Sequence, residues 1–198
     1  MTGKIKEPFY KKNWFWVIII IIICGVAGYG GNKNISIPSI KSSITTEVKK
    51  DDNRKVTYDK FSKIKIGSTY EEVKNILGEG KESKSSEVGK IKEVIYTWYN
   101  EDGSNMNITI KNNKVIGKGQ AGLSSKKAEV NMIKYTKIKK GMDYNKVKEI
   151  LDDGQLISIS EVNGITRSVY LWINPDGTNM NVTFENGKSI ARTQLGLK

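Results

Sequence analysis

The apolar positions along the chain change their period, and the first pattern is an unbroken run. Residues 13–32 hold no charged side chain. Their length matches a bilayer core of about 30 Å for a helix that rises about 1.5 Å per residue. Trp14 and Trp16 stand at one end and Tyr29 at the other, as is typical of membrane interfaces. The run therefore predicts a transmembrane anchor over 14–31.

The flanks of this run predict how the chain is oriented. Residues 1–13 carry four lysines against one glutamate, which favours a cytoplasmic N-terminus and an extracellular C-terminal part at the cell membrane. Residues 32–56 are polar, rich in Ser, Thr and Lys, and have no sustained period, so a flexible linker is expected there. A cleaved signal peptide with secretion of the rest is the alternative. Ile23 precedes Cys24, which disfavours a lipoprotein.

Beyond the linker the pattern occurs twice. Residues 61–123 align without a gap with residues 135–197 at an offset of 74, and 29 of the 63 positions are identical. Trp98 and Trp172 head the most similar stretches, "WYNEDGSNMNITI" and "WINPDGTNMNVTF". The chain therefore contains an internal duplication.

Each copy opens with helical spacing and continues with strand spacing. Thr69 and Glu72 have the spacing of a capping box, and an apolar stripe follows at helical intervals from Tyr70 to Leu77. Short β-branched and aromatic segments separated by Asn/Asp-Gly turns come next. Each copy therefore predicts two helices and then four antiparallel strands.

The expected fold class is α+β, with an N-terminal transmembrane helix before two tandem helix–helix–four-stranded sheet repeats. The predicted boundaries are a cytoplasmic N-terminus at 1–13, the anchor at 14–31, the linker at 32–56, repeat 1 at 57–123 and repeat 2 at 124–198.

Alternation along the strands predicts which side of each sheet a given residue faces. The set expected to face the helices comprises Ile95, Thr97, Tyr99, Met106, Ile108 and Ile110. The set expected on the open side comprises Tyr96, Trp98, Asn107, Tyr170, Trp172 and Asn181. Exposed Tyr and Trp are typical anchors of protein interfaces. The competing interpretation is that these rings only pack the fold.

Composition restricts the chemistry. The protein has a net charge of +12, but the charge is dispersed and no nucleic-acid-binding motif occurs. It contains no histidine, and Cys24 is its one cysteine, so His-dependent triads and Cys/His metal sites are excluded. The paired acids Asp51–Asp52 and Asp152–Asp153 lie in turn-like contexts. The sequence therefore predicts neither an enzyme nor a cofactor nor a nucleic-acid partner.

The helix–glycine–helix segments "FSKIKIGSTYEEVKNILGEG" and "YTKIKKGMDYNKVKEILDDG" resemble those of the BLIP-like and SmpA/OmlA (BamE-like) superfamily. Tandem copies with four strands each are similar to the β-lactamase inhibitor protein family, especially its membrane-anchored Firmicute members. In that family the concave, aromatic sheet surface grips a partner enzyme, and the loop after the second strand reaches into its active site. The resemblance implies this role for loops 100–104 and 174–178, with Asp102 and Asp176 at their tips.

The sequence departs from the secreted inhibitors because it lacks their disulfides and includes a predicted anchor, so β-lactamase is not carried over as its target. The sequence predicts a membrane-anchored, extracytoplasmic, non-enzymatic protein-binding module. The alternative is a structural scaffold of SmpA/OmlA type that rests on anionic lipid or wall polymer. The expected partner-binding residues are Tyr96, Trp98, Asp102, Asn107, Tyr170, Trp172, Asp176 and Asn181.

Overall fold

A computed structural model describes residues 55–88 and 91–198, which belong to one compact unit, Asn53–Lys198. The predicted anchor and nearly all of the predicted linker lie outside the described residues. Within the described part of the protein, no helix has the length and apolarity needed to cross a membrane.

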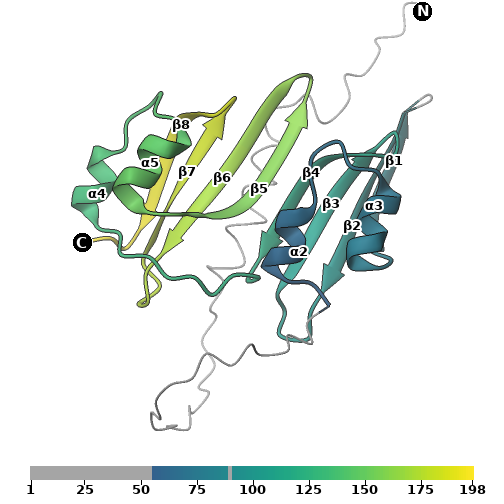
Figure 1. The fold of residues 1–198 in the computed structure, drawn as a ribbon, viewed down its shortest axis with the longest axis horizontal. Helices are drawn as coiled ribbons and strands as arrows, with labels where there is room; N and C mark the ends of the chain where they lie inside the picture. The colour runs from purple at the N-terminus through teal and green to yellow at the C-terminus, as the bar shows by residue number, and fades with distance from the viewer. Residues whose placement is uncertain (1–54, 89–90) are drawn as a thin grey trace, which may run out of the picture. The chain divides into compact units, whose positions relative to one another are not determined.

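The described unit is an α+β fold in which both copies form the same series of elements (Figure 1). Repeat 1 contains α2 (Tyr58–Lys63), α3 (Tyr70–Leu77), β1 (Lys81–Val88), β2 (Ile91–Tyr99), β3 (Asn105–Lys111) and β4 (Lys114–Ala121). Repeat 2 contains α4 (Met132–Lys137), α5 (Tyr144–Leu151), β5 (Gln155–Val162), β6 (Ile165–Ile173), β7 (Asn179–Glu185) and β8 (Lys188–Leu195).

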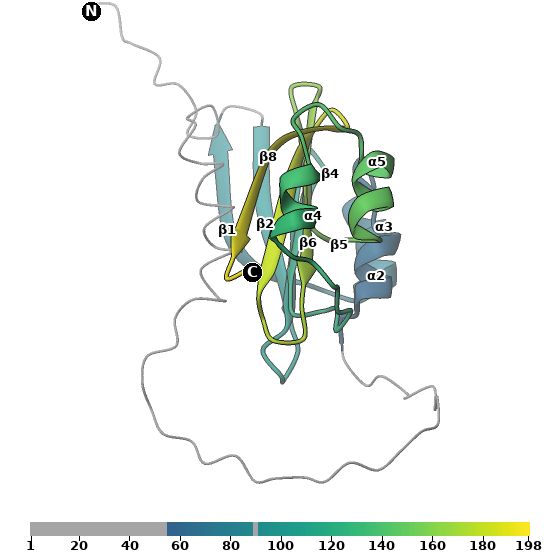
Figure 2. The same cartoon turned by 90° about the vertical axis from the view of Figure 1, so that its left-hand side faces the viewer.

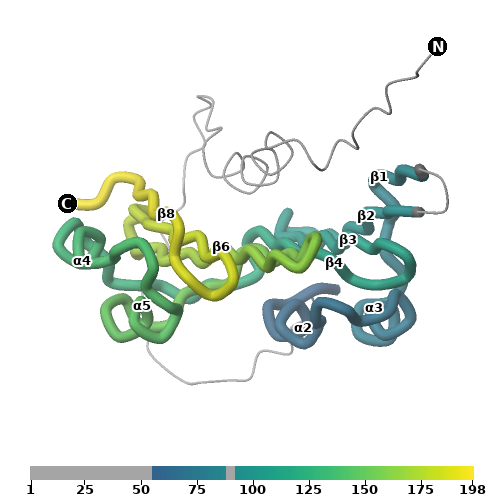
Figure 3. Tube along the Cα trace, turned by 90° about the horizontal axis from the view of Figure 1, so that it is seen from above, coloured from purple at the N-terminus to yellow at the C-terminus, as the bar shows by residue number. Residues whose placement is uncertain are grey.

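The strands form one eight-stranded antiparallel sheet in sequence order, because the two four-stranded halves join edge to edge. β4 pairs with β5 through Gly117 opposite Ser160 and Gly119 opposite Ser158. Figures 2 and 3 show α2, α3 and α5 on one side of this sheet, and Arg192 of β8, opposite the buried Val182, holds α4 to the same side by donating to the Tyr135 carbonyl. The other side is not covered by any described element and is called the open face below.

Hydrogen bonds made by side chains also hold the two repeats together. The Leu156 backbone N–H donates to the Tyr58 hydroxyl at 2.7 Å, and the Gln120 side-chain amide donates to the Leu156 carbonyl at 3.1 Å. Burial raises the pKa of Tyr58, so the hydroxyl stays neutral and available at this junction. One helix and one strand of repeat 1 thereby fix the first strand of repeat 2.

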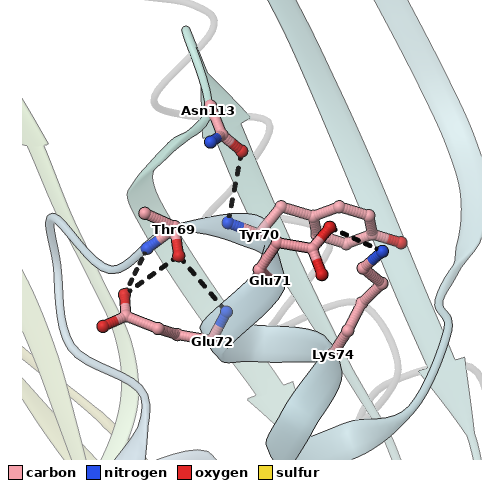
Figure 4. Close-up of polar contacts among 6 residues, drawn as sticks. All are labelled: Thr69, Tyr70, Glu71, Glu72, Lys74 and Asn113. Atoms are coloured by element: carbon pink, nitrogen blue, oxygen red, sulfur yellow. Dashed lines mark hydrogen bonds and ion pairs between the residues drawn. The ribbon is translucent and has the colours of Figure 1, made fainter.

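Helix α3 begins with a capping box, as the sequence predicted (Figure 4). The Thr69 hydroxyl accepts from the Glu72 N–H at 3.2 Å, and the Glu72 carboxylate accepts from the Thr69 N–H at 2.6 Å. Asn113, in the turn between β3 and β4, accepts from the Tyr70 N–H at 3.4 Å. These bonds satisfy N–H groups that the first turn leaves without helical partners, and they fasten the helix to the sheet. In α5 the N-cap is Asp143.

The two repeated tryptophans are core residues. Trp98 and Trp172 are each 1% exposed. Trp98 belongs to one apolar cluster with Val73 and Leu77 of α3, and Trp172 belongs to the equivalent cluster in repeat 2. Their neighbours Tyr96 and Tyr170 pack against the same clusters and lie against tyrosine rings of the helices. The prediction that Tyr96, Trp98, Tyr170 and Trp172 lie on the open face is therefore wrong.

The pairing of β2 with β3 explains the error. Trp98 lies directly opposite Met106, and Tyr96 lies directly opposite Ile108. Directly opposed residues share a face of the sheet. The correct prediction that Met106 and Ile108 are buried therefore requires both rings on the helix side. Alternation shows which residues of a single strand share a face of the sheet. It does not show which residues of the next strand lie on that face, because this depends on the pairing register across the five-residue loop that joins the two strands.

Each indole lies against a glycine at the start of its repeat's first strand. A Cβ atom on Gly80 would come within 2.5 Å of the Trp98 ring, and one on Gly154 within 2.6 Å of the Trp172 ring. The indole N–H of Trp98 donates to the Gly78 carbonyl at 3.2 Å, at the end of α3. In repeat 2 Trp172 donates to the Asp152 carbonyl at 3.0 Å. Each tryptophan thus connects the sheet, the helix end and the turn between them.

A cation lies beneath the first helix of each repeat. The Lys118 ammonium donates to the Phe61 and Ile64 carbonyls at 2.7 and 2.6 Å, at the C-terminal end of α2. Burial lowers the pKa of Lys118 to about 8. Arg192 donates to the equivalent carbonyls, those of Tyr135 and Ile138. Positive charge at a helix C-terminus is favourable, and here it adds to the bonds that the Ile64 and Ile138 N–H groups make to the Phe61 and Tyr135 carbonyls.

We expect Gly80→Ala to lower the free energy of unfolding by roughly 1–3 kcal/mol, because the added methyl group overlaps the Trp98 ring in a packed core. Urea denaturation followed by circular dichroism measures this change. In a Trp98→Leu background the same substitution should cost clearly less, because the ring that it meets is gone.

Gly117→Ala is the matched control, since a Cβ there would make an ordinary contact of 3.4 Å with Ser160. Its effect should be small. Equal costs for Gly80→Ala with and without the Trp98 ring would contradict the contact between this glycine and the indole.

Candidate functional site

The open face is a mixed surface of aliphatic and small polar side chains. In repeat 2, β6 contributes Val169, Leu171 and Ile173, which are half-buried and alternate with Tyr170 and Trp172 of the core side. In repeat 1, Ile95 and Tyr99 of β2 occupy the same side. The prediction that Ile95, Thr97 and Tyr99 face the helices is wrong, for the reason of register given above.

A row of mainly small polar residues crosses the middle of this face. Each strand in turn places one residue directly opposite the next. The row runs through Thr97, Asn107, Gly119, Ser158, Val169 and Thr183. At the centre, where the repeats meet, Gly119 is buried and Ser158 is half-buried, so small residues form the surface there. Such a surface suits close approach of another protein.

The most exposed apolar side chains of the open face lie toward one end of the strands. Tyr99 is 59% exposed at the end of β2, and Leu195 is 62% exposed at the end of β8. Both lie in the rows that border the β2–β3 and β6–β7 loops, since Tyr99 is opposite Asn105 and Leu195 is opposite Asn179. An aromatic and an aliphatic side chain held on rigid strands are typical anchor residues.

Charged cross-strand pairs mark the opposite end of the face. Glu93 lies directly opposite Lys111 in repeat 1, and Arg167 lies directly opposite Glu185 in repeat 2, so the charges of the pair are reversed. Arg167 reaches Glu185 with two nitrogens, at 2.8 and 2.7 Å. Burial raises the pKa of Glu93, and the charges of Lys111 and Lys84 oppose that shift. At this end of the open face, opposite charges therefore lie next to each other on neighbouring strands.

The β2–β3 and β6–β7 loops are held by asparagines at their first positions. Asn100 binds both backbone groups of Val56: its carbonyl accepts from the Val56 N–H at 3.0 Å, and its amide donates to the Val56 carbonyl at 2.8 Å. Asn174 makes the same pair of bonds to Val130. Val56, which the sequence assigned to the linker, is fully buried. The segment that enters each repeat therefore anchors the loop beside the open face.

The loop aspartates are exposed but folded back onto their own loops. Asp102 accepts from the N–H and hydroxyl of Ser104 at 2.8 and 2.5 Å. Asp176 accepts from the N–H and hydroxyl of Thr178 at 3.0 and 2.7 Å. The side-chain bond from Thr178 is the main cause that lowers the pKa of Asp176. One oxygen of each carboxylate therefore shapes the loop rather than pointing away from it.

Four of the eight residues proposed from the sequence lie where that proposal requires. Asn107 and Asn181 are on the open face, and Asp102 and Asp176 are in the two loops. The four aromatic residues are on the helix side. Sequence reasoning missed Tyr99 and Leu195, and cross-strand register was the signal that could have found Tyr99.

The described residues contain no group of three or more His, Cys, Asp or Glu side chains that could hold a metal ion. The open face instead offers amides, hydroxyls and apolar surface, which are groups that bind another molecule by hydrogen bonding and burial.

Comparison with known proteins agrees with this architecture. Residues 57–172 match the family model of the β-lactamase inhibitor (BLIP) family. The fold is also similar to the crystal structure of a Streptococcus mutans protein described as a candidate β-lactamase inhibitor. That structure has a TM-score of 0.61 and 24% identity, and the match covers 70% of this chain and 94% of that one. A comparison with curated proteins gives no match.

The match spans more than half of the sequence, and the protein therefore belongs to the β-lactamase inhibitor (BLIP) family, as the helix–glycine–helix segments indicated. The fold and the family together define a class of protein-binding, inhibitor-type domains.

Proposed function

We propose that this protein is a non-enzymatic, membrane-anchored module that binds an extracytoplasmic protein on the open face of its sheet. The single observation that carries the proposal is the exposure of Tyr99 and Leu195, at 59% and 62%, on a sheet face that no described helix covers. Two rigid loops border these side chains. The helix side of the same sheet is already filled by the core.

The open face supports binding better than catalysis. Its polar groups are mainly Asn, Thr and Ser, and the sequence has no histidine to act as a base near neutral pH. Glu93, the carboxylate most deeply buried on this face, lies opposite Lys111. A hydrolytic site needs a nucleophile or a base that is not already paired with an opposite charge, and these residues do not provide one.

The class of partner follows from the make-up of the face. Aliphatic side chains on β6, a Gly/Ser seam and exposed Tyr99 and Leu195 suit a partner that presents a mixed apolar and polar protein surface. Family membership makes a β-lactamase one candidate. Because Asp102 and Asp176 each use an oxygen within their own loops, these loops offer a preformed shape, which keeps the entropic cost of binding low.

The membrane anchor is part of the proposal and rests on the sequence. Residues 13–32 have no charge, and the lysine-rich start precedes them. A tethered module would meet its partner at the cell surface, where the local concentration of the tethered domain is high.

Capture of partners by the full-length protein from cell-envelope extracts, followed by mass spectrometry, tests the binding surface. Leu195→Ala and Tyr99→Ala should each reduce recovery of the partner by about tenfold, as expected when an interface anchor is truncated. A panel of purified β-lactamases, assayed with the full-length protein, shows whether any of them is that partner.

Lys63→Ala is the control, because Lys63 is exposed but lies on α2, on the other side of the sheet. It should leave recovery unchanged. If Leu195→Ala and Tyr99→Ala bind the same partners as the unaltered protein, the open face is not the binding surface.

The proposed orientation has a test of its own. Protease added to intact, wall-stripped cells should digest everything that follows residue 31, since this part is expected outside the membrane. Digestion only after the cells are lysed would exclude the extracytoplasmic location and would leave the open-face proposal untouched.

A further inference from the structure

The helix layer of repeat 2 has an unusual surface that the binding face does not use. Ile133, on α4, is 68% exposed, the highest value among the large apolar side chains of the described residues. Lys137 follows it at i+4, so the two side chains lie on the same side of the helix. Lys139, Lys140 and Lys146 are also exposed within the same helix pair. An exposed apolar side chain thus belongs to a helix pair that carries several exposed lysines.

Repeat 1 provides an internal comparison for this surface. Residues 58–77 hold four lysines and three acids, a net charge of +1, whereas residues 132–151 hold six lysines and two acids, a net charge of +4. Three differences between the copies make the charge of repeat 2 more positive: Asp59 corresponds to Ile133, Ile66 to Lys140, and Glu72 to Lys146. The copies share the buried positions of Ile64, Val73 and Leu77, which correspond to Ile138, Val147 and Leu151, whereas Ile133, Lys140 and Lys146 are exposed.

The acids of this helix pair do little to offset its lysines. Asp143 lies 3.5 Å from Lys188 of β8, and Asp153, just beyond α5, lies 2.8 Å from Lys148. Lys146 adds to the positive charge that lowers the pKa of Asp143, but no described acid forms an ion pair with Lys137, Lys139, Lys140 or Lys146. Their positive charge is therefore available to a partner from outside the protein.

We propose that the α4–α5 surface rests on an anionic phospholipid bilayer. Lysine ammonium groups attract anionic headgroups at short range, and an exposed isoleucine gains by entering the apolar boundary of the bilayer. A soluble polyanion would use the lysines but would gain nothing from Ile133. The combination of the two kinds of side chain favours lipid over a free polymer.

The surface lies on the helix side of the sheet and the proposed partner site lies on the open face (Figures 2 and 3). The two contacts can therefore form at the same time. The inference concerns a second surface, and it stands whether or not the open face has a protein partner.

Lysine acylation of the full-length protein, read by mass spectrometry, tests this proposal. The protein is mixed with vesicles of phosphatidylcholine alone or of phosphatidylcholine with phosphatidylglycerol. Lys137 and Lys139 should be acylated at least about threefold more slowly on the anionic vesicles, because the headgroups cover them. Raising the salt to about 0.5 M should remove most of this protection, since salt screens exposed charges.

Lys63 and Lys65 are the matched internal controls. They occupy the positions of Lys137 and Lys139 in repeat 1 and are likewise exposed. Their acylation should be the same on both kinds of vesicle. This comparison separates contact by the α4–α5 surface from attachment of the protein through its N-terminal segment, which would not distinguish the two repeats.

A variant that gives repeat 2 the residues of repeat 1, Ile133→Asp with Lys140→Ile and Lys146→Glu, should lose the protection. The fold already accepts these residues at the equivalent positions of repeat 1. Equal acylation of both lysine pairs on anionic vesicles would overturn the proposal. Soluble polyphosphate that protects Lys137 and Lys139 as strongly as the vesicles would also overturn it, in favour of a polymer site.

Discussion

The contact of each tryptophan with a glycine is the constraint on which the rest of the structure depends. The indole of Trp98 can lie beneath its helix because Gly80 has no side chain, and Trp172 repeats this arrangement with Gly154. A buried Trp side chain removes on the order of 150–250 Å² of surface from water, so few other single contacts could hold so short a helix to a sheet. The helices have only six or eight residues and are marginal alone.

This constraint also determines which side of the sheet is open to a partner. Once both indoles lie under the helices, alternation places Thr97, Tyr99 and Asn107 on the other side. Because β4 pairs with β5, the open faces of the two four-stranded halves form one continuous surface. The same residues that fill the core thus leave a broad face that no described element covers, which is the geometry expected of a protein-binding domain.

The sequence predicted the elements of the fold well, because their signals are local. The capping box at Thr69, the Asn/Asp-Gly turns and the duplication all appear where the pattern placed them. The residues of the open face were not predicted correctly, because they depend on how strands pair across a loop. The residue type of Trp98 suggests an interface aromatic, whereas its packing against Gly80 is a tertiary contact that no local pattern shows. The edge-to-edge joining of the repeats was missed for the same reason.

The central claim is that the tryptophan side of the sheet is buried and the Tyr99 side is open. Hydroxyl-radical footprinting of the native full-length protein tests it directly, because Trp and Met side chains are among the most reactive toward the radical. We expect Trp98, Trp172, Met106 and Met180, which are at most 1% exposed, to remain unmodified while Tyr99 and the less reactive Leu195 are labelled. Rapid modification of Trp98 and Trp172 in the folded protein, with Tyr99 protected, would contradict the account.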